Sequence, residues 1–264
     1  MQRLARRSQR AAILVLVALM LGILVGAGTA HAMPQDLAGK AWQRIPTKQK
    51  VIVLTFDAGG GSGGVPEILR TLNKYDIPAT FFLTGRWARQ FPHKVAKIAA
   101  GGFVLGNHTD THRKVSTLSD STLRSELRST NRSVRKAGGR GTKPWFRFPY
   151  GAHTPSDIAR VNALGYACIQ WTVDTLGWMG TSGGQSVSSV VQHVLDHLEP
   201  GEIVLMHVGQ HPTDGSTLDA DALDSIIQAV RARGYGFTTV RALLPEPPAP
   251  AVVASTPPPT ESAS

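Results

Sequence analysis

Residues Val51 to Gly64 read VIVLTFDAGGGSGG, an apolar, β-branched run that ends in an acid and then breaks into glycines. A continuous apolar run of this kind is typical of a strand buried on both faces, as in a parallel sheet covered by helices. The glycines allow a sharp turn and keep bulky side chains away from Asp57. A single acid at a strand end is more often a turn residue than a functional one, so the other strands must decide its role.

The rest of the chain alternates between helical and strand patterns. Helical periodicity predicts helices at 65–75, 92–100, 119–137, 154–164, 186–198 and 219–233. Apolar runs predict further strands at 79–83, 103–106, 145–148, 166–173, 203–206 and 235–240. Such alternation over roughly 200 residues predicts an α/β fold with parallel strands, an incomplete or distorted (β/α)7 barrel. An open doubly wound sheet is the alternative, because spacing alone does not show closure.

The two ends of the chain do not share this pattern. A basic start without acids, an apolar stretch and an A-x-A cleavage site form the layout of an export signal, at 1–10, 11–28 and 30–32. The apolar stretch is long for a cleaved signal, so an uncleaved membrane anchor is the alternative for 1–32. Residues 244–264 alternate Pro with Ala, Ser, Thr and Glu, which predicts a disordered tail.

These boundaries leave 33–49 as a predicted linker and 50–243 as the globular domain. We expect an exported protein that is extracellular or associated with the cell wall, and we expect it to be a monomer. The net charge is +10 at pH 7, but the basic residues are not clustered with aromatic ones, so nucleic acid is not an expected partner. Cys168 is the only cysteine, which excludes an internal disulfide and a cysteine zinc site.

Polar side chains recur where the predicted strands end. An acid, a histidine or an arginine follows each of several different strands: Asp57, His108, Arg147, Asp174 and His207. In parallel α/β folds, and in barrels above all, these ends converge on the face where active sites are built. Unrelated turn residues would not be expected to form such a set, so we predict one active site rather than separate turns.

His108 and His112 lie four residues apart in the segment NHTDTH. A single helical turn would place both imidazoles on one face, which is the geometry of zinc ligands. Ligation by histidine and carboxylate without cysteine suits a borderline divalent cation that keeps positions open for water and substrate. We therefore predict a divalent metal site, with zinc as the expected ion.

On these residues the sequence resembles the polysaccharide deacetylases of carbohydrate esterase family 4, the NodB homology domain, over about 50–243. The family motifs T-F-D-D-G, H-S/T-x-x-H, R-x-P-Y, D-x-x-D-W and L-x-H correspond in order to TFDAG at 55–59, HTDTH at 108–112, RFPYG at 147–151, DTLGW at 174–178 and LMH at 205–207. The motifs together are specific, and the resemblance implies an incomplete (β/α) barrel.

The resemblance also implies a role for each matched residue. In the reacting centre, Asp57 would be the general base, Arg147 its partner, His108 and His112 the metal ligands, His207 the general acid and Asp174 the residue that holds His207. Around the substrate, Tyr150 would supply a backbone oxyanion donor, and Leu205 and Trp178 would line the pocket for the acetyl methyl. The implied protein is a metal-dependent hydrolase that removes acetyl groups from an N-acetylated glycan, such as peptidoglycan or another N-acetylglucosamine polymer.

Two positions depart from the family pattern. Ala58 stands where the family usually has its third metal ligand, and Gly177 stands at the second acid of D-x-x-D-W. Either Asp57 coordinates the metal itself, or water fills the gap, or another acid takes part. Asp110 is expected to point away, and the acid-rich loop 211–221 is expected to be a solvated loop and helix cap. A glycan-binding pseudoenzyme and an O-acetyl esterase of the xylan type remain the alternative functions.

Overall fold

The computed structural model of this protein describes residues 34–245. The predicted export signal or anchor and nearly all of the predicted Pro-rich tail lie outside the described residues. Within 34–245, no helix is both long and apolar enough to cross a membrane.

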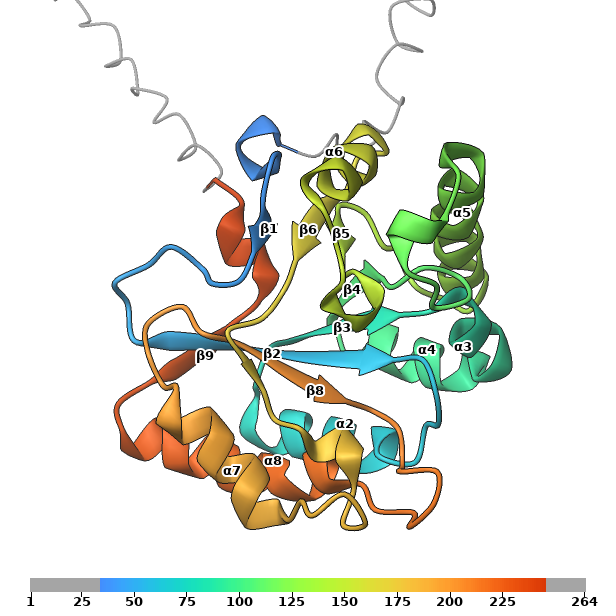
Figure 1. The fold of residues 1–264 in the computed structure, drawn as a ribbon. Coiled ribbons are helices and arrows are strands. Elements are labelled where there is room, and N and C mark those ends of the chain that lie inside the picture. The colour runs from blue at the N-terminus through green and yellow to red at the C-terminus, as the bar shows by residue number, and fades with distance from the viewer. Residues whose placement is uncertain (1–33, 246–264) are drawn as a thin grey trace, which may run out of the picture. The chain divides into compact units, whose positions relative to one another are not determined.

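The strands are short, and helices separate most of them (Figure 1). The strands are β1 (Ala41–Trp42), β2 (Val51–Ala58), β3 (Ala79–Leu83), β4 (Val104–Asn107), β5 (Trp145–Phe146), β6 (Ala167–Ile169), β7 (Val173–Asp174), β8 (Ile203–His207) and β9 (Gly236–Thr238). The α-helices are α2 (Val65–Tyr75), α3 (Gly85–Gln90), α4 (Pro92–Ala100), α5 (Asp120–Lys136), α6 (Pro155–Ala163), α7 (Val187–Asp196) and α8 (Leu218–Ala232).

The strands form one sheet in the order β1-β6-β5-β4-β3-β2-β8-β7, and β9 pairs with the start of β2. All pairings between these strands are parallel. β2 is the longest strand and lies at the centre, where β8 pairs with one edge and β9 and β3 pair in succession with the other. The predicted α/β fold with parallel strands is therefore confirmed.

The order of the strands requires the sheet to curl. From β6 to β7 the sheet has six strand spacings, which would span about 29 Å in a flat sheet. β6 ends at Ile169 and β7 begins at Val173, and a connection of four residue steps reaches only about 14 Å. The two sides of the sheet must therefore approach each other, and the incomplete barrel is confirmed.

The strand predicted at 166–173 is wrong in one respect. It is divided into β6 and β7, which pair with different neighbours: β6 with β1 and β5, and β7 with β8. The residues between them cross the gap in the barrel, and Trp171 among them reaches the pocket described below. Ile169, Trp171 and Val173 alternate with Gln170 and Thr172, which is itself a strand pattern, so the sequence shows no boundary there.

The side chains of β2 alternate between two environments, as the period of a strand requires. Leu54, Phe56 and Ala58 belong to the core that packs against helices such as α2 and α8. Asp57 faces the other way and lines the pocket at the carboxyl end of the sheet. Figure 1 shows α2, α7 and α8 together on one side of β2 and β8. The two neighbours Asp57 and Ala58 thus point to opposite sides of the sheet.

The segment predicted as a linker packs against the domain over its described part. Leu37 and Ile45 are 1% and 2% exposed and belong to a core cluster that includes strand residues of β2 and β6. β1 adds a short edge to the sheet by pairing with β6. A two-residue strand carries no periodicity, so the sequence pattern could not reveal it.

Candidate active site

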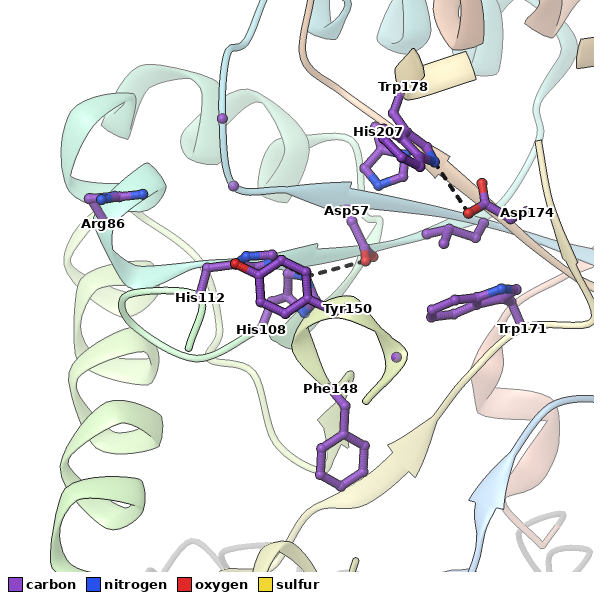
Figure 2. Close-up of a pocket in the computed structure, with 14 residues that line it drawn as sticks. Asp57, Arg86, His108, His112, Phe148, Tyr150, Trp171, Asp174, Trp178 and His207 are labelled. Carbon is purple, nitrogen blue, oxygen red and sulfur yellow. Dashed lines mark hydrogen bonds and ion pairs between the residues drawn. The ribbon is translucent and has the colours of Figure 1, made fainter. Parts of the chain in front are cut away.

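A cavity of about 580 Å³ opens at the carboxyl ends of the strands. Figure 2 shows that its side chains come from segments far apart in the sequence and that Asp57, His108, His112 and Tyr150 gather together, while the ring of Phe148 points away from them. The residues that line it are Asp57, Gly59, Gly60, Arg86, His108, His112, Phe148, Tyr150, Gly151, Trp171, Asp174, Trp178, Leu205 and His207. The convergence predicted for the strand ends is present, apart from Arg147, whose side chain lies behind Asp57 and is fully buried.

Asp57 is fixed from behind by Arg147. The Nη1 atom of Arg147 donates to Oδ1 of Asp57 over 2.8 Å and to Oγ1 of Thr55 over 2.9 Å, while Nη2 donates to the carbonyl oxygen of Gln170. The other oxygen, Oδ2, lies 3.3 Å from Nε2 of His108. Burial raises the pKa of Asp57, but the charge and the hydrogen bond of Arg147, with smaller contributions from the neighbouring imidazoles, outweigh it, and the pKa falls below its usual value. Asp57 is therefore ionised near neutral pH.

The two histidines meet, although they do not lie on a helix. Their Nε2 atoms are 3.1 Å apart, but the connecting segment is a loop in which Thr109 and His112 both have φ of 61°. The expected helical turn is wrong, because these left-handed residues fold the loop back after β4. His108 Nδ1 lies 2.9 Å from the carbonyl oxygen of Arg147, which holds the ring by hydrogen bonding and turns Nε2 toward the pocket.

Both imidazoles are neutral near pH 7. Burial lowers the pKa of His108, and burial together with His108 lowers the pKa of His112 to about 4. A neutral imidazole offers a lone pair to a metal, whereas a protonated one does not. The charge state of the pair therefore suits ligation.

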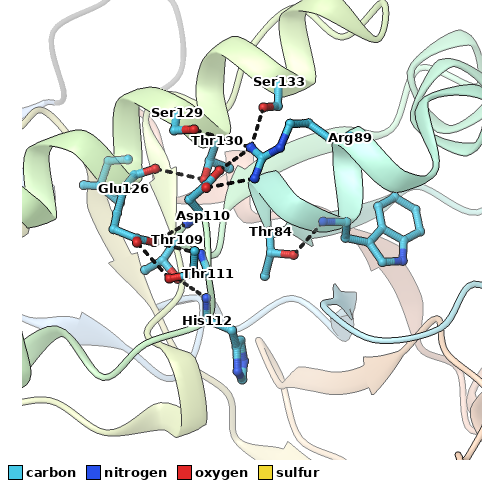
Figure 3. A network of polar contacts seen from close by, with 12 residues as sticks. Thr84, Arg89, Thr109, Asp110, Thr111, His112, Glu126, Ser129, Thr130 and Ser133 are labelled. Carbon is cyan, nitrogen blue, oxygen red and sulfur yellow. Dashed lines mark hydrogen bonds and ion pairs between the residues drawn. The ribbon is translucent and has the colours of Figure 1, made fainter.

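A buried carboxylate from α5 binds the loop that carries the histidines (Figure 3). Glu126 of α5 accepts hydrogen bonds from the backbone nitrogens of Asp110 and Thr111, at 2.7 and 2.8 Å, and from Oγ1 of Thr111 at 2.8 Å. Asp110 pairs with Arg89 of α3, whose Nη1 lies 2.6 Å from Oδ1, so it points away from the histidines as expected. Glu126 was not predicted, because it lies far in the sequence from Asp110 and Thr111, which donate to it, and only folding brings them together.

The distance between the Nε2 atoms of the two histidines suits two ligands of one metal ion. Two nitrogens at the usual zinc distance from one tetrahedral ion would lie about 3.3 Å apart, close to the observed 3.1 Å. Among residues 34–245, no group of three or more histidine, cysteine, aspartate or glutamate side chains has the arrangement of a complete metal site. Ala58 is buried in the core on the opposite face of β2. The site therefore offers two imidazoles and the nearby carboxylate of Asp57.

His207 lies at the end of β8, opposite the histidine pair, and its partner differs from the expected one. Its backbone nitrogen donates to Oδ2 of Asp219 over 2.8 Å, and its Nδ1 lies 3.6 Å from the same oxygen. Asp174 instead accepts from the backbone nitrogen of Leu176 and from Nε1 of Trp178. The ring of His207 thus faces Asp219, from the start of α8, while Asp174 contacts Leu176 and Trp178. Sequence proximity could not show the contact with Asp219.

The carboxylates around His207 control its charge. Burial lowers the pKa of His207, but Asp219, Asp57 and Asp174 together outweigh it and raise the pKa above the usual value. His207 can therefore carry a proton near neutral pH, while His108 and His112 across the same pocket do not.

The remaining predicted residues form the walls of the cavity. Leu205 is buried beneath it, whereas Tyr150 and Trp178 are 65% and 51% exposed at its rim. Tyr150 has φ of 61°, and its ring contacts His112 with centroids 4.5 Å apart. Trp171 and Arg86 also line the cavity but were not predicted, because Trp171 fell inside the single strand predicted at 166–173 and Arg86 lies in α3.

Comparison with known proteins gives consistent similarities. The family model for polysaccharide deacetylase matches residues 44–169. A peptidoglycan-N-acetylglucosamine deacetylase of Bacillus cereus is 32% identical over 197 residues, which cover 74% of this chain and 68% of that protein.

Solved structures add a second kind of relative. A CE4 family pseudoenzyme from Bacillus anthracis is 31% identical with a TM-score of 0.71, covering 80% of this chain and 71% of that one. A mutant form described as a pseudoenzyme with restored enzymatic activity is 32% identical, with the same TM-score, and covers 80% of this chain and 73% of that one. The similar proteins thus include both a named deacetylase and a named pseudoenzyme.

Proposed function

Because this chain belongs to the polysaccharide deacetylase family of carbohydrate esterases, we propose that it is a hydrolase that removes acetyl groups from an N-acetylated glycan. Peptidoglycan or another N-acetylglucosamine polymer is the proposed substrate, in line with the names of relatives such as the Bacillus cereus protein. The layout of residues 1–32 supports an exported protein that meets this substrate at the cell wall.

One observation carries this proposal: an ionised acid and a protonatable histidine lie in one cavity with a neutral histidine pair. A divalent cation held by His108 and His112 would polarise the acetyl carbonyl and acidify a water molecule. Asp57 keeps Oδ2 free of Arg147, so this oxygen can accept the proton of the attacking water.

His207 supplies the second proton transfer. Attack of water on the carbonyl carbon is followed by cleavage of the carbon–nitrogen bond, and the departing nitrogen must gain a proton to leave as an amine. The raised pKa of His207 keeps a proton available for this step. Acetate and a free amino sugar are the products.

The walls of the cavity would orient the sugar. Leu205 offers an apolar floor for the acetyl methyl group, and the rings of Tyr150, Trp171 and Trp178 offer apolar faces to the sugar. The backbone nitrogen of Tyr150 is the proposed donor to the developing oxyanion, as the family resemblance implies.

A glycan-binding pseudoenzyme is the second candidate, because the site has one acidic donor fewer than the family pattern and a similar fold is a named pseudoenzyme. Acetate release from N-acetylglucosamine oligomers and from peptidoglycan, with the full chain loaded with Zn²⁺ or Co²⁺ or treated with a chelator, separates the two. Metal-dependent release is expected. If the loaded protein binds these glycans and releases no acetate from any N- or O-acetylated one, the pseudoenzyme reading holds.

A further inference from the structure

We propose that Asp219 is a positioning residue for His207, and that it supplies from α8 the carboxylate that the family pattern has at position 177. The inference rests on the proposed function for its catalytic meaning. Its structural part concerns the folded protein alone and can be tested without turnover.

The space beside Gly177 is already occupied by a carboxylate. A Cβ atom at position 177 would collide with Oδ1 of Asp219 and would lie 2.7 Å from its Cγ and 3.1 Å from its Oδ2. These are the three nearest atoms, so no other group within reach limits a side chain there as closely. Gly177 and Asp219 are thus alternative sources of one carboxylate: a side chain at either position would fill the same volume.

The carboxylate of Asp219 is held in a fixed orientation. It is 4% exposed, its Oδ1 accepts from Oγ1 of Thr175 over 2.6 Å, and its Oδ2 accepts from the backbone nitrogen of His207 over 2.8 Å. These two donors come from segments that flank the cavity, after β7 and at the end of β8. A buried carboxylate that is bound on both oxygens has little freedom to turn elsewhere.

The same oxygen faces the imidazole of His207. Nδ1 of His207 is buried and has no hydrogen-bond partner within residues 34–245, and Oδ2 of Asp219 lies 3.6 Å from it. A small rotation of the ring would bring the two atoms within hydrogen-bond distance. With a proton on Nδ1 directed at Asp219, Nε2 is left for the substrate side.

Other charged groups around His207 are differently engaged. Asp57 of β2 is bound by Arg147 and faces His108, and Asp174 of β7 binds Leu176 and Trp178. His108 and His112 lie across the cavity, where their Nε2 atoms face each other. Asp219 is therefore the carboxylate placed to bind Nδ1.

A role limited to starting α8 does not account for this placement. Asp219 and Asp221 both lie in the first turn of the helix, where an acid is favourable. Asp221 is exposed and accepts from Oγ1 of Thr217, which satisfies that requirement at the surface. Asp219 is buried against His207 instead, so Asp221 offers a matched control on the same helix turn.

The test is the titration of His207 by NMR in the metal-free full chain. Asp219→Asn should lower the pKa of His207 by about one unit or more, whereas Asp221→Asn should leave it unchanged. In acetate release, Asp219→Asn should lower kcat about 10- to 100-fold with little change in KM, and should move the alkaline limb of the pH profile to lower pH.

The decisive variant moves the carboxylate from position 219 to position 177. Gly177→Asp alone should destabilise the protein by collision, whereas Gly177→Asp combined with Asp219→Ser should restore the pKa of His207, even if Asp219→Asn fails to fold. An unchanged pKa in Asp219→Asn, or an unrestored pKa in the double variant, would overturn the proposal. Absence of acetate release in the wild type would instead count against the proposed function, because the titration does not depend on it.

Discussion

Arg147 and Asp57 form a buried pair in which Nη1 donates to Oδ1 over 2.8 Å, with side chains that are 0% and 7% exposed. A buried ion pair of this kind stabilises little by itself, but removal of one partner leaves the other charge without compensation. The pair also fixes which carboxylate oxygen is free, since Oδ1 is taken by Arg147 and Oδ2 faces His108. A change at Asp57 should therefore affect both the stability of the folded protein and the proposed proton transfer.

Asp57→Asn should lower acetate release by about 10²- to 10⁴-fold, because the amide cannot accept the proton of the attacking water. It should also lower the melting temperature, since Arg147 would then be a buried cation without its carboxylate. Both effects can be measured on one preparation by acetate assay and calorimetry. Asp221→Asn serves as the exposed control, and equal activity of Asp57→Asn and wild type would exclude Asp57 as the base.

Ala58→Asp should make the stability of the protein depend on metal. Without metal, the new carboxylate would stand in the apolar core around Ala58 and lower the melting temperature. With Zn²⁺, the carboxylate would have to turn from the core toward the histidines at the end of β2 to become an added ligand; binding should then tighten, and each tenfold gain in affinity is worth about 1.4 kcal/mol. Zn²⁺ should therefore raise the melting temperature of the variant more than that of the wild type.

Calorimetric titration with Zn²⁺ measures the same effect directly. Ala58→Ser is the matched control, because it adds a polar group without a charge. An Ala58→Asp protein that is destabilised but gains no affinity for Zn²⁺ would show that the side chain at position 58 stays in the core, away from the histidines, and cannot contribute a ligand.

Glu126→Gln should loosen the loop that carries both histidines. The amide can accept fewer of the three hydrogen bonds that Glu126 now receives from Asp110 and Thr111, and groups that hold metal ligands commonly affect affinity about 10- to 100-fold. We expect weaker Zn²⁺ binding by titration and lower activity at limiting metal. Glu67→Gln, in the exposed pair with Arg70, should change neither.

Glu202 should make the protein less stable as pH rises. Burial raises the pKa of Glu202 to about 8, and the charge of Arg44 offsets only part of this. The folded state therefore keeps a proton that the unfolded chain releases near its ordinary pKa of 4.5. The stabilisation is complete below pH 4.5 and is lost as pH rises toward 8.

Glu202→Gln, which imitates the protonated acid, should raise the melting temperature at pH 9 and leave it nearly unchanged at pH 5. Glu199→Gln is the partly exposed neighbour for comparison, with a side chain 41% exposed, and should show no such selective gain. Equal shifts for Glu202→Gln at both pH values would contradict a titrating Glu202.

Local sequence patterns predicted the elements better than their connections. The helices at 65–75 and 92–100 and the strand at 79–83 have the predicted bounds, and Ser119 and Thr154 cap the helices that follow them. These features depend on periodicity and on hydrogen bonds within a few residues. The division of 166–173 into two strands depends on closure of the barrel, which no local pattern contains.

In the candidate site, too, some residues could be predicted from local sequence and others depend on the fold. Residues at strand ends, such as Asp57 and His207, could be identified because parallel strands bring their ends together. Asp219 and Glu126 could not, because each acts on a partner from a different element and its own surroundings in the sequence suggest only a helix. The contact between Asp219 and the space beside Gly177 exists only in the folded chain.

The hydrogen bonds that Glu126 accepts from the loop after β4 affect how tightly a site with two histidines could bind a metal ion. Three hydrogen bonds hold the loop backbone and Thr111, and the carbonyl of Arg147 holds the ring of His108. Folding has already ordered these side chains, so an arriving ion would not bear that entropic loss, which otherwise amounts to about 0.5–1.5 kcal/mol per immobilised side chain. The rigidity of the two remaining histidine ligands can thus offset part of the metal-binding free energy that is lost with the third ligand.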